Sequence, residues 1–168
     1  MRKKKLKIQV KLDSESRILP FITFKLEGVE DEFIALVDSG SEATLLDFQV
    51  AKKLTESSKY KEYRGGKMVL DGLGGSINEE QGALFSMIAT IMAANEEQWE
   101  IPLMGATMDM GVMQAGLSRA CNDKPVAMII GSDTLCRLNA KIDYIKQQLE
   151  LNGVLSDKAG FDISADMA

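Results

Sequence analysis

No histidine occurs among the 168 residues of this chain. A Ser-His-Asp triad, a Cys-His pair and a histidine-ligated zinc site are therefore excluded within it. Any chemistry must use carboxylates, hydroxyls, lysines, backbone groups or a borrowed cofactor. The chain has only two cysteines, Cys121 and Cys136, whereas a disulfide framework would need more of them in a shorter chain. We expect both to be free, buried thiols.

Long apolar runs are also absent, because none approaches the roughly 20 residues that a membrane-spanning helix needs. Lys7, Gln9 and Lys11 interrupt any apolar signal-peptide core behind the basic residues 2–5. We therefore expect a cytoplasmic protein with no membrane partner. The net charge of −5 argues against a nucleic-acid partner, and residues 2–5 fit a solvated arm better than a phosphate-binding patch.

Alternating apolar residues predict a mostly β chain with one domain over residues 1–152 and a flexible tail over 153–168. Ile22, Phe24 and Leu26 alternate with polar residues, as in a half-buried strand. Further strands are expected at 6–12, 33–37, 67–70, 83–93 and 126–130, with a closing strand pair at 142–151 and a polar connection at 60–66. Short helices are expected after Asp47 and after Ser132 or Asp133, which are plausible N-caps.

The segment from about 95 to 124 is rich in methionine and harder to interpret. Helical spacing is possible from Met110 to Leu117. Methionine adapts to varied surfaces, so these side chains could line a flexible apolar groove. Plain filling of the core is the interpretation that we favour.

The sequence ALVDSG (residues 35–40) carries an apolar run straight into a carboxylate, Asp38. Gly40 lets the backbone turn at once, which would hold the carboxylate at the floor of a cleft. A buried carboxylate needs hydrogen-bond donors, and Ser39 and the amides of Gly40 and Ser41 can supply them. Alternatively, Asp38 merely starts an Asx-type turn. The motif by itself leaves both possibilities open.

Two later segments add to this motif. KMVLDGLGGSI (67–77) is dense enough in glycine to require a mobile or tight hairpin tip, and it lacks the Lys-Ser/Thr of a phosphate-binding loop. AMIIGSDTL (127–135) combines an apolar strand, a glycine and the start of a short helix. Asp71, Asp133 and Asp143 are best explained as turn, cap or surface residues.

In this order, the three segments resemble the catalytic motif, the flap hairpin and the apolar-apolar-Gly strand of the retropepsin-like aspartic proteases. The resemblance covers roughly residues 6–152. It implies a closed, barrel-like retropepsin (acid protease) fold, mostly β, with one flap hairpin and one or two short helices.

The resemblance also implies an aspartic endopeptidase that uses no metal or cofactor. Because the chain has one such motif, a homodimer would pair two Asp38 carboxylates around a water, acting on a polypeptide substrate. The implied catalytic residues are Asp38, Ser39 and Gly40, and the implied substrate-binding residues are Ser41, Leu73, Gly74, Gly75 and Ile130.

Two departures from the family pattern stand out. The segment between flap and apolar-apolar-Gly strand is longer than in retroviral enzymes, and Ser132 replaces the arginine that helps tie their dimer. Ser39 replaces the more common threonine, and family members use either. An inactive retropepsin-fold dimer that binds peptides or serves assembly is the alternative function. A small β-barrel interaction domain, in which the motifs are ordinary turns, is another.

Overall fold

A computed structural model of the chain describes residues 6–13, 19–27, 29–57, 59–63, 70–72, 75–77 and 83–155. Strands dominate this part and the three helices are short, so the predicted mostly β class is confirmed. The strands are β1 (Leu6–Lys11), β2 (Phe21–Leu26), β3 (Glu32–Val37), β4 (Leu45–Asp47), β5 (Tyr60–Tyr63), β6 (Leu70–Gly72), β7 (Gly75–Ile77), β8 (Leu84–Met92), β9 (Gln98–Met108), β10 (Val126–Ile130), β11 (Lys141–Asp143) and β12 (Gln148–Leu155). The helices are α1 (Phe48–Leu54), α2 (Gly111–Ala120) and α3 (Ser132–Arg137).

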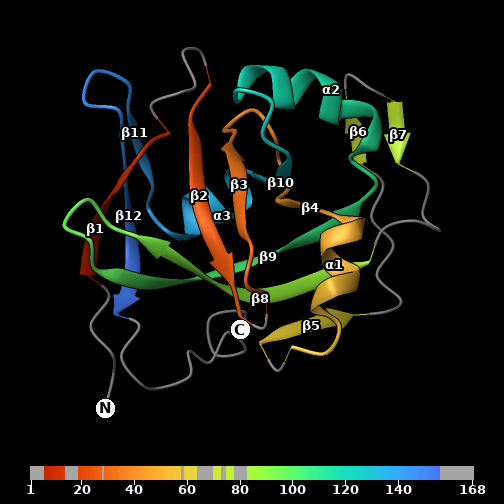
Figure 1. Ribbon diagram of the computed structural model, residues 1–168, viewed down its shortest axis with the longest axis horizontal. Coiled ribbons are helices and arrows are strands. Elements are labelled where there is room, and N and C mark those ends of the chain that lie inside the picture. Colours follow the sequence, from red (N-terminus) through yellow and green to blue (C-terminus); the bar gives the residue numbers. More distant parts are fainter. Residues whose placement is uncertain are drawn as a thin grey trace.

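Six strands close into a barrel (Figure 1). Hydrogen-bonded neighbours follow one another in the order β9, β4, β10, β3, β2 and β8, and β8 pairs with β9 to complete the ring. Within the ring, β10 runs parallel to β3, and β4 runs parallel to β9. Parallel neighbours bring the carboxyl ends of two strands together. The ends of β3 and β10 therefore meet at one point on the barrel.

The barrel strands bury both of their faces. In β3, Ala35 and Val37 belong to the larger of two apolar clusters, whereas Ile34 and Leu36 belong to the smaller one. This alternation is the period of two that a strand imposes on its side chains. Partly buried side chains of α2, including Met113 and Leu117, pack against the smaller cluster. The near-continuous apolar sequence of residues 33–37 follows from burial on both sides.

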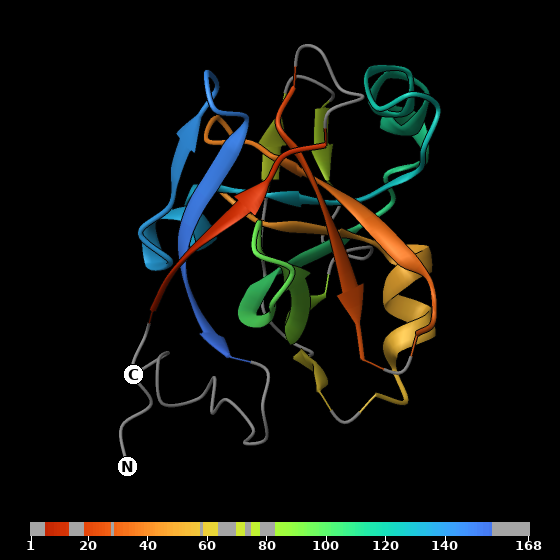
Figure 2. The same cartoon turned by 60° about the vertical axis from the view of Figure 1, so that its left-hand side comes forward.

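A second group of strands extends the sheet beyond the barrel. β1 pairs with β12, and β12 pairs with β9 and, through a hairpin, with β11. In both ribbon views, this hairpin and α2 lie on opposite sides of the same end of the molecule (Figures 1 and 2). β6 and β7 form a separate two-stranded hairpin at residues 70–77.

Several sequence predictions need correction. Residues 60–63 form β5, which pairs with β8, instead of a polar connection. Both helices expected after polar residues exist, but neither has a side-chain cap: Asp47 occupies the N-cap of α1 without capping it, and Gly131 occupies the N-cap of α3. Cys121 is buried as predicted, but Cys136 is exposed.

The methionine-rich segment forms a barrel strand and a helix. Its first half is β9 and its second half is α2. Met110 is fully buried and Met108 is 8% exposed, as core filling requires. Met108 and Met110 thus fill the core beside the barrel strand β9, as the favoured interpretation predicts, whereas Met104 and Met113 are half-buried.

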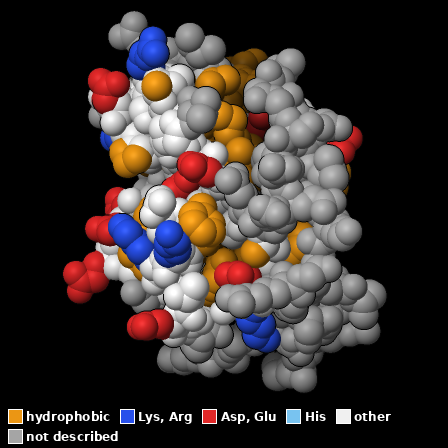
Figure 3. Space-filling model, turned by 90° about the vertical axis from the view of Figure 1, so that its right-hand side faces the viewer, with side chains coloured by type: hydrophobic (Ala, Val, Ile, Leu, Met, Phe, Trp, Pro, Cys, Tyr) orange, Lys and Arg blue, Asp and Glu red, His pale blue; other side chains and the backbone are white. Residues whose placement is uncertain are grey.

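On the face that carries α1, acidic, basic and apolar side chains are interspersed among the described residues (Figure 3). Phe48 at the start of α1 is partly exposed, and the Lys52 ammonium lies 4.6 Å from the centre of its ring. Elsewhere, the buried Glu100 carboxylate accepts a hydrogen bond from Lys59 at 2.9 Å, and this bond raises the pKa of Lys59. Within the described ranges, no helix is long and apolar enough to cross a bilayer.

Candidate functional site

Asp38 stands where the chain leaves β3 and turns. Its backbone N–H still donates to the carbonyl of Ile130 at the end of β10, at 2.9 Å. The turn is closed by the N–H of Gly40, which donates to Asp38 Oδ1 at 2.9 Å, and by the N–H of Ser41, which donates to the Asp38 carbonyl. Asp38 is half-buried and Ser39 and Gly40 are exposed. The carboxylate thus sits at the surface in a fixed orientation.

The backbone of the loop from Asp38 to Thr44 packs closely against Gly131 and Gly105. A Cβ on Gly131 would overlap the carbonyl of Ala43 and would lie 2.8 Å from the carbonyl oxygen of Ser41. A Cβ on Gly105, in β9, would overlap the carbonyl of Thr44. Only glycine permits so close an approach of two backbones. These two glycines therefore set how deeply the loop packs into the barrel end.

Polar contacts attach the far end of the loop to α3. The Thr44 hydroxyl, which is fully buried, lies 2.7 Å from Asp133 Oδ1 and 2.7 Å from the Thr134 hydroxyl. The Thr44 N–H donates to Asp133 Oδ2 at 3.1 Å, and the Gly131 N–H donates to the Thr44 hydroxyl at 3.1 Å. The Thr44 carbonyl accepts from the N–H of Ala106 at 2.9 Å. All polar groups of Thr44 are thus engaged.

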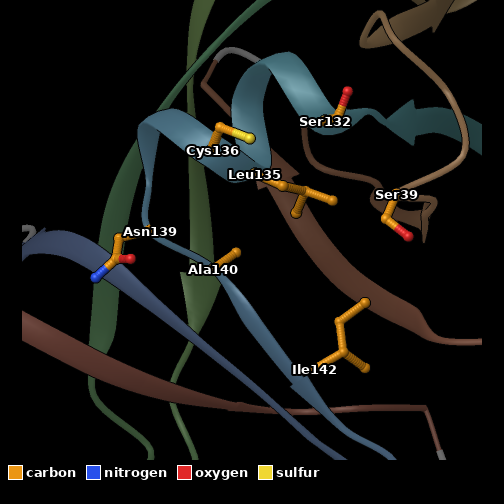
Figure 4. Close-up of a pocket in the computed structure, with 7 residues that line it drawn as sticks. All are labelled: Ser39, Ser132, Leu135, Cys136, Asn139, Ala140 and Ile142. Atoms are coloured by element: carbon orange, nitrogen blue, oxygen red, sulfur yellow. The ribbon is translucent and has the colours of Figure 1, made fainter.

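A pocket of about 510 Å³ opens beside the turn (Figure 4). Ser39 contributes from the loop, and Leu135 and Cys136 contribute from α3. Ile142 contributes from β11, and the remaining lining residues are Ser132, Asn139 and Ala140. The pocket is mostly apolar and lies next to the residue that follows the carboxylate.

The sequence-predicted site residues are only partly brought together. Asp38, Ser39 and Gly40 form one turn, but the Ser41 hydroxyl donates to the Ala43 carbonyl at 2.7 Å and so is used within the loop. The Ile130 side chain is 3% exposed and packs in the larger apolar cluster of the barrel. Its neighbour Ile129 faces the other cluster.

Of the three predicted substrate-binding residues at 73–75, the structure describes Gly75 alone. Gly75 opens β7 opposite Gly72 of β6, whereas Leu73 and Gly74 lie outside the described residues. Asp143 behaves as the predicted turn residue, since its Oδ1 accepts the N–H of Lys146 at 2.8 Å. Among the described residues, no three His, Cys, Asp or Glu side chains gather as metal ligands.

Sequence reasoning missed Thr44 and Gly105, and it assigned Asp133 only a capping or surface role. The partners of Thr44 lie about 90 positions later in the chain. No local pattern of residues signals such a contact. The Gly-Ser-Asp-Thr sequence after β10 predicts only a helix start.

No protein-family model and no curated protein matches the chain. Among solved structures, it is similar to the retroviral protease-like domain of Ddi1 from Leishmania major, with a TM-score of 0.46 and 16% identity over 84% of this chain and 98% of that one. It is also similar to a retropepsin-like aspartic protease from Rickettsia conorii, with a TM-score of 0.44 and 16% identity over 92% of this chain and 94% of that one.

Proposed function

We propose that this chain is the subunit of a homodimeric aspartic endopeptidase. The observation that carries the proposal is the Asp38 turn: a carboxylate at the joined ends of two parallel barrel strands, held through Oδ1 by the Gly40 N–H. Within the described part of the chain, Oδ2 has no hydrogen-bond partner. One oxygen is thus orientated and the other is available for a water or a second carboxylate.

Hydrolysis of a peptide bond by carboxylates needs two of them, one as base and one as acid. When two carboxyl groups share a site, both cannot ionise, so one keeps its proton and the pair titrates as a unit. The base deprotonates a shared water that attacks the carbonyl carbon, and the acid protonates the departing amine. No metal or cofactor is needed for these proton transfers.

In this proposal, the second carboxylate is Asp38 of a partner subunit. A two-fold axis beside the turn would set the same surface of each subunit against the other. Exposure of Ser39 and Gly40 supports such an arrangement, because the turn is free to approach its copy. The apolar pocket beside Ser39 lies on the same surface and would be covered by the partner. An extended polypeptide would then cross the paired carboxylates.

The test replaces Asp38 by Asn and, as a matched control, Asp109 by Asn. Asp109 begins a turn with the same local hydrogen bond, but it lies at the start of α2. Cleavage of a peptide library should fall by at least ~10²–10⁴-fold in Asp38→Asn, the usual contribution of acid–base catalysis, and should be unchanged in Asp109→Asn. Sedimentation should give a folded dimer for both variants.

Mixing subunits makes the test sharper. An excess of Asp38→Asn chains should quench wild-type activity, because each mixed dimer keeps a single carboxylate, whereas Asp109→Asn chains should not. Full activity in Asp38→Asn would end the proposal. A dimer that binds peptides but never cleaves them would instead establish the inactive peptide-binding module.

A further inference from the structure

The Thr44 hydroxyl has a complete and unambiguous set of hydrogen bonds. A carboxylate only accepts, so Thr44 must donate its single proton to Asp133 Oδ1. Its oxygen then accepts from the Gly131 N–H and from the Thr134 hydroxyl. One donor and two acceptor positions are thereby all filled. A buried hydroxyl with every position used fixes its neighbours in one arrangement.

The Asp133 carboxylate faces three donors. Its Oδ1 accepts from the Thr44 hydroxyl and from the N–H of Thr134, and its Oδ2 accepts from the N–H of Thr44. An amide of the same shape would present an NH₂ group to one of these donors. The site therefore suits a carboxylate specifically, although Asp133 lies in the first turn of a helix that it does not cap.

Backbone hydrogen bonds also attach the loop to α3. The first two N–H groups of α3, from Ser132 and Asp133, donate to the carbonyls of Ser41 and Glu42 at 2.7 and 3.2 Å. The first N–H groups of any helix have no partner within the helix, so these two need acceptors from outside it. The loop that begins with Asp38 is thus attached at its first residue to β10 and at its last residues to α3.

We propose that Thr44 and Asp133 are positioning residues for the Asp38 carboxylate, an assignment that rests on the function proposed above. Within the described residues, neither side chain forms a hydrogen bond with Asp38. Together they fix the far end of a seven-residue loop whose near end carries the carboxylate. Carboxylate pairs act only when they are held within a fraction of an ångström, and displacement by about 1 Å can cost roughly 10²-fold in rate.

The test compares Thr44→Val, which keeps the shape and removes the hydroxyl, with Thr44→Ser, which keeps the hydroxyl. Thr107→Val is the matched control, because the Thr107 hydroxyl is also buried in the barrel but accepts from the N–H of Ala83 and, among the described residues, forms no hydrogen bond with the loop. We expect Thr44→Val to lower kcat by ~10–100-fold with KM within about twofold. Thr44→Ser and Thr107→Val should keep kcat within about threefold.

Hydrogen exchange gives a readout that does not depend on activity. In Thr44→Val, exchange at the amides of Gly131, Ser132 and Asp133 should accelerate by about tenfold or more, while Thr107→Val should leave it unchanged. If the wild-type protein cleaves nothing, the proposed function fails, and exchange still decides whether Thr44 and Asp133 hold the loop.

Two results would overturn the assignment: exchange at these amides unaffected by loss of the Thr44 hydroxyl, or equal kcat in Thr44→Val and Thr107→Val. Should Thr44→Val fail to fold, Asp133→Asn replaces it, since that change keeps the volume and sacrifices one of three hydrogen bonds. Asp133→Asn with unchanged kcat and unchanged exchange at Gly131 would equally refute the role.

Discussion

The turns at Asp38 and Asp109 share one local structure in two different surroundings. Each aspartate directly follows a barrel strand, β3 or β9, and in each the N–H of the glycine two residues later donates to Asp Oδ1 at 2.9 Å. Beyond the turn they diverge. Gly111 begins α2, whereas Gly40 leads into the loop that Thr44 attaches to α3.

The comparison shows that an Asp-X-Gly turn is not in itself a catalytic feature. The hydrogen bond within the turn satisfies an exposed amide wherever the sequence allows it. What distinguishes Asp38 is the packing behind it: Gly131 against the loop backbone and a pocket beside Ser39. Experiments that perturb this packing should therefore affect the first turn alone.

The largest effect is expected for Gly131→Ala, compared with Gly111→Ala. The new methyl group at position 131 would collide with the carbonyls of Ala43 and Ser41, which are backbone atoms and cannot rotate away. Overpacking of this kind costs about 3 kcal/mol. At Gly111, the nearest atom is the flexible Asp109 carboxylate oxygen at 3.0 Å, so the cost should stay below about 1 kcal/mol. Urea denaturation measures both free energies of unfolding. Similar values for the two variants would contradict the difference in packing.

Much of the barrel could be predicted from sequence because its signals are local. Strict alternation identified β2, and unbroken apolar runs identified β3 and β10. The Asp38 turn was also predictable, since a carboxylate followed closely by glycine favours a bend. These features depend on neighbours within a few residues.

β9 could not be predicted because its sequence contains two residues that usually weaken strands. Pro102 lacks an N–H, and Gly105 lacks a side chain. Pro102 lies between the part of β9 that pairs with β12 and the part that pairs with β4. At this position, β8 is the one described strand beside β9. The N–H that proline lacks is therefore missing where β9 has a described neighbour on one side alone. Gly105 is required by the approach of the Thr44 carbonyl. Both reasons come from contacts distant in sequence.

A smaller effect is expected when the second turn loses its own support. Asp47 Oδ1 accepts from the N–H of Met110 at 3.2 Å, next to the Asp109 turn. Asp47→Ala should cost about 1 kcal/mol, the usual net value of one hydrogen bond, and should accelerate amide exchange at Met110. Exchange at Gly131 and peptidase activity should be unchanged. If exchange rises equally at Gly131, the two turns are coupled and cannot be compared as independent.

The smallest effect is expected for Gly116→Ala, and it has the opposite sign to Gly131→Ala. Gly116 is exposed in the middle of α2, and a Cβ there would meet no atom within 4 Å. Alanine should therefore stabilise the helix by up to ~1 kcal/mol, since glycine loses more backbone entropy on folding. Thermal unfolding measures the gain, and kcat should not change, because α2 follows the turn that has no role in the proposed chemistry.

Adding one methyl group to each glycine thus distinguishes two kinds of position: at 131 the space is occupied by the loop that carries Asp38, and at 116 it is occupied by solvent. A loss of stability or of kcat in Gly116→Ala would mean that α2 supports the first turn as well.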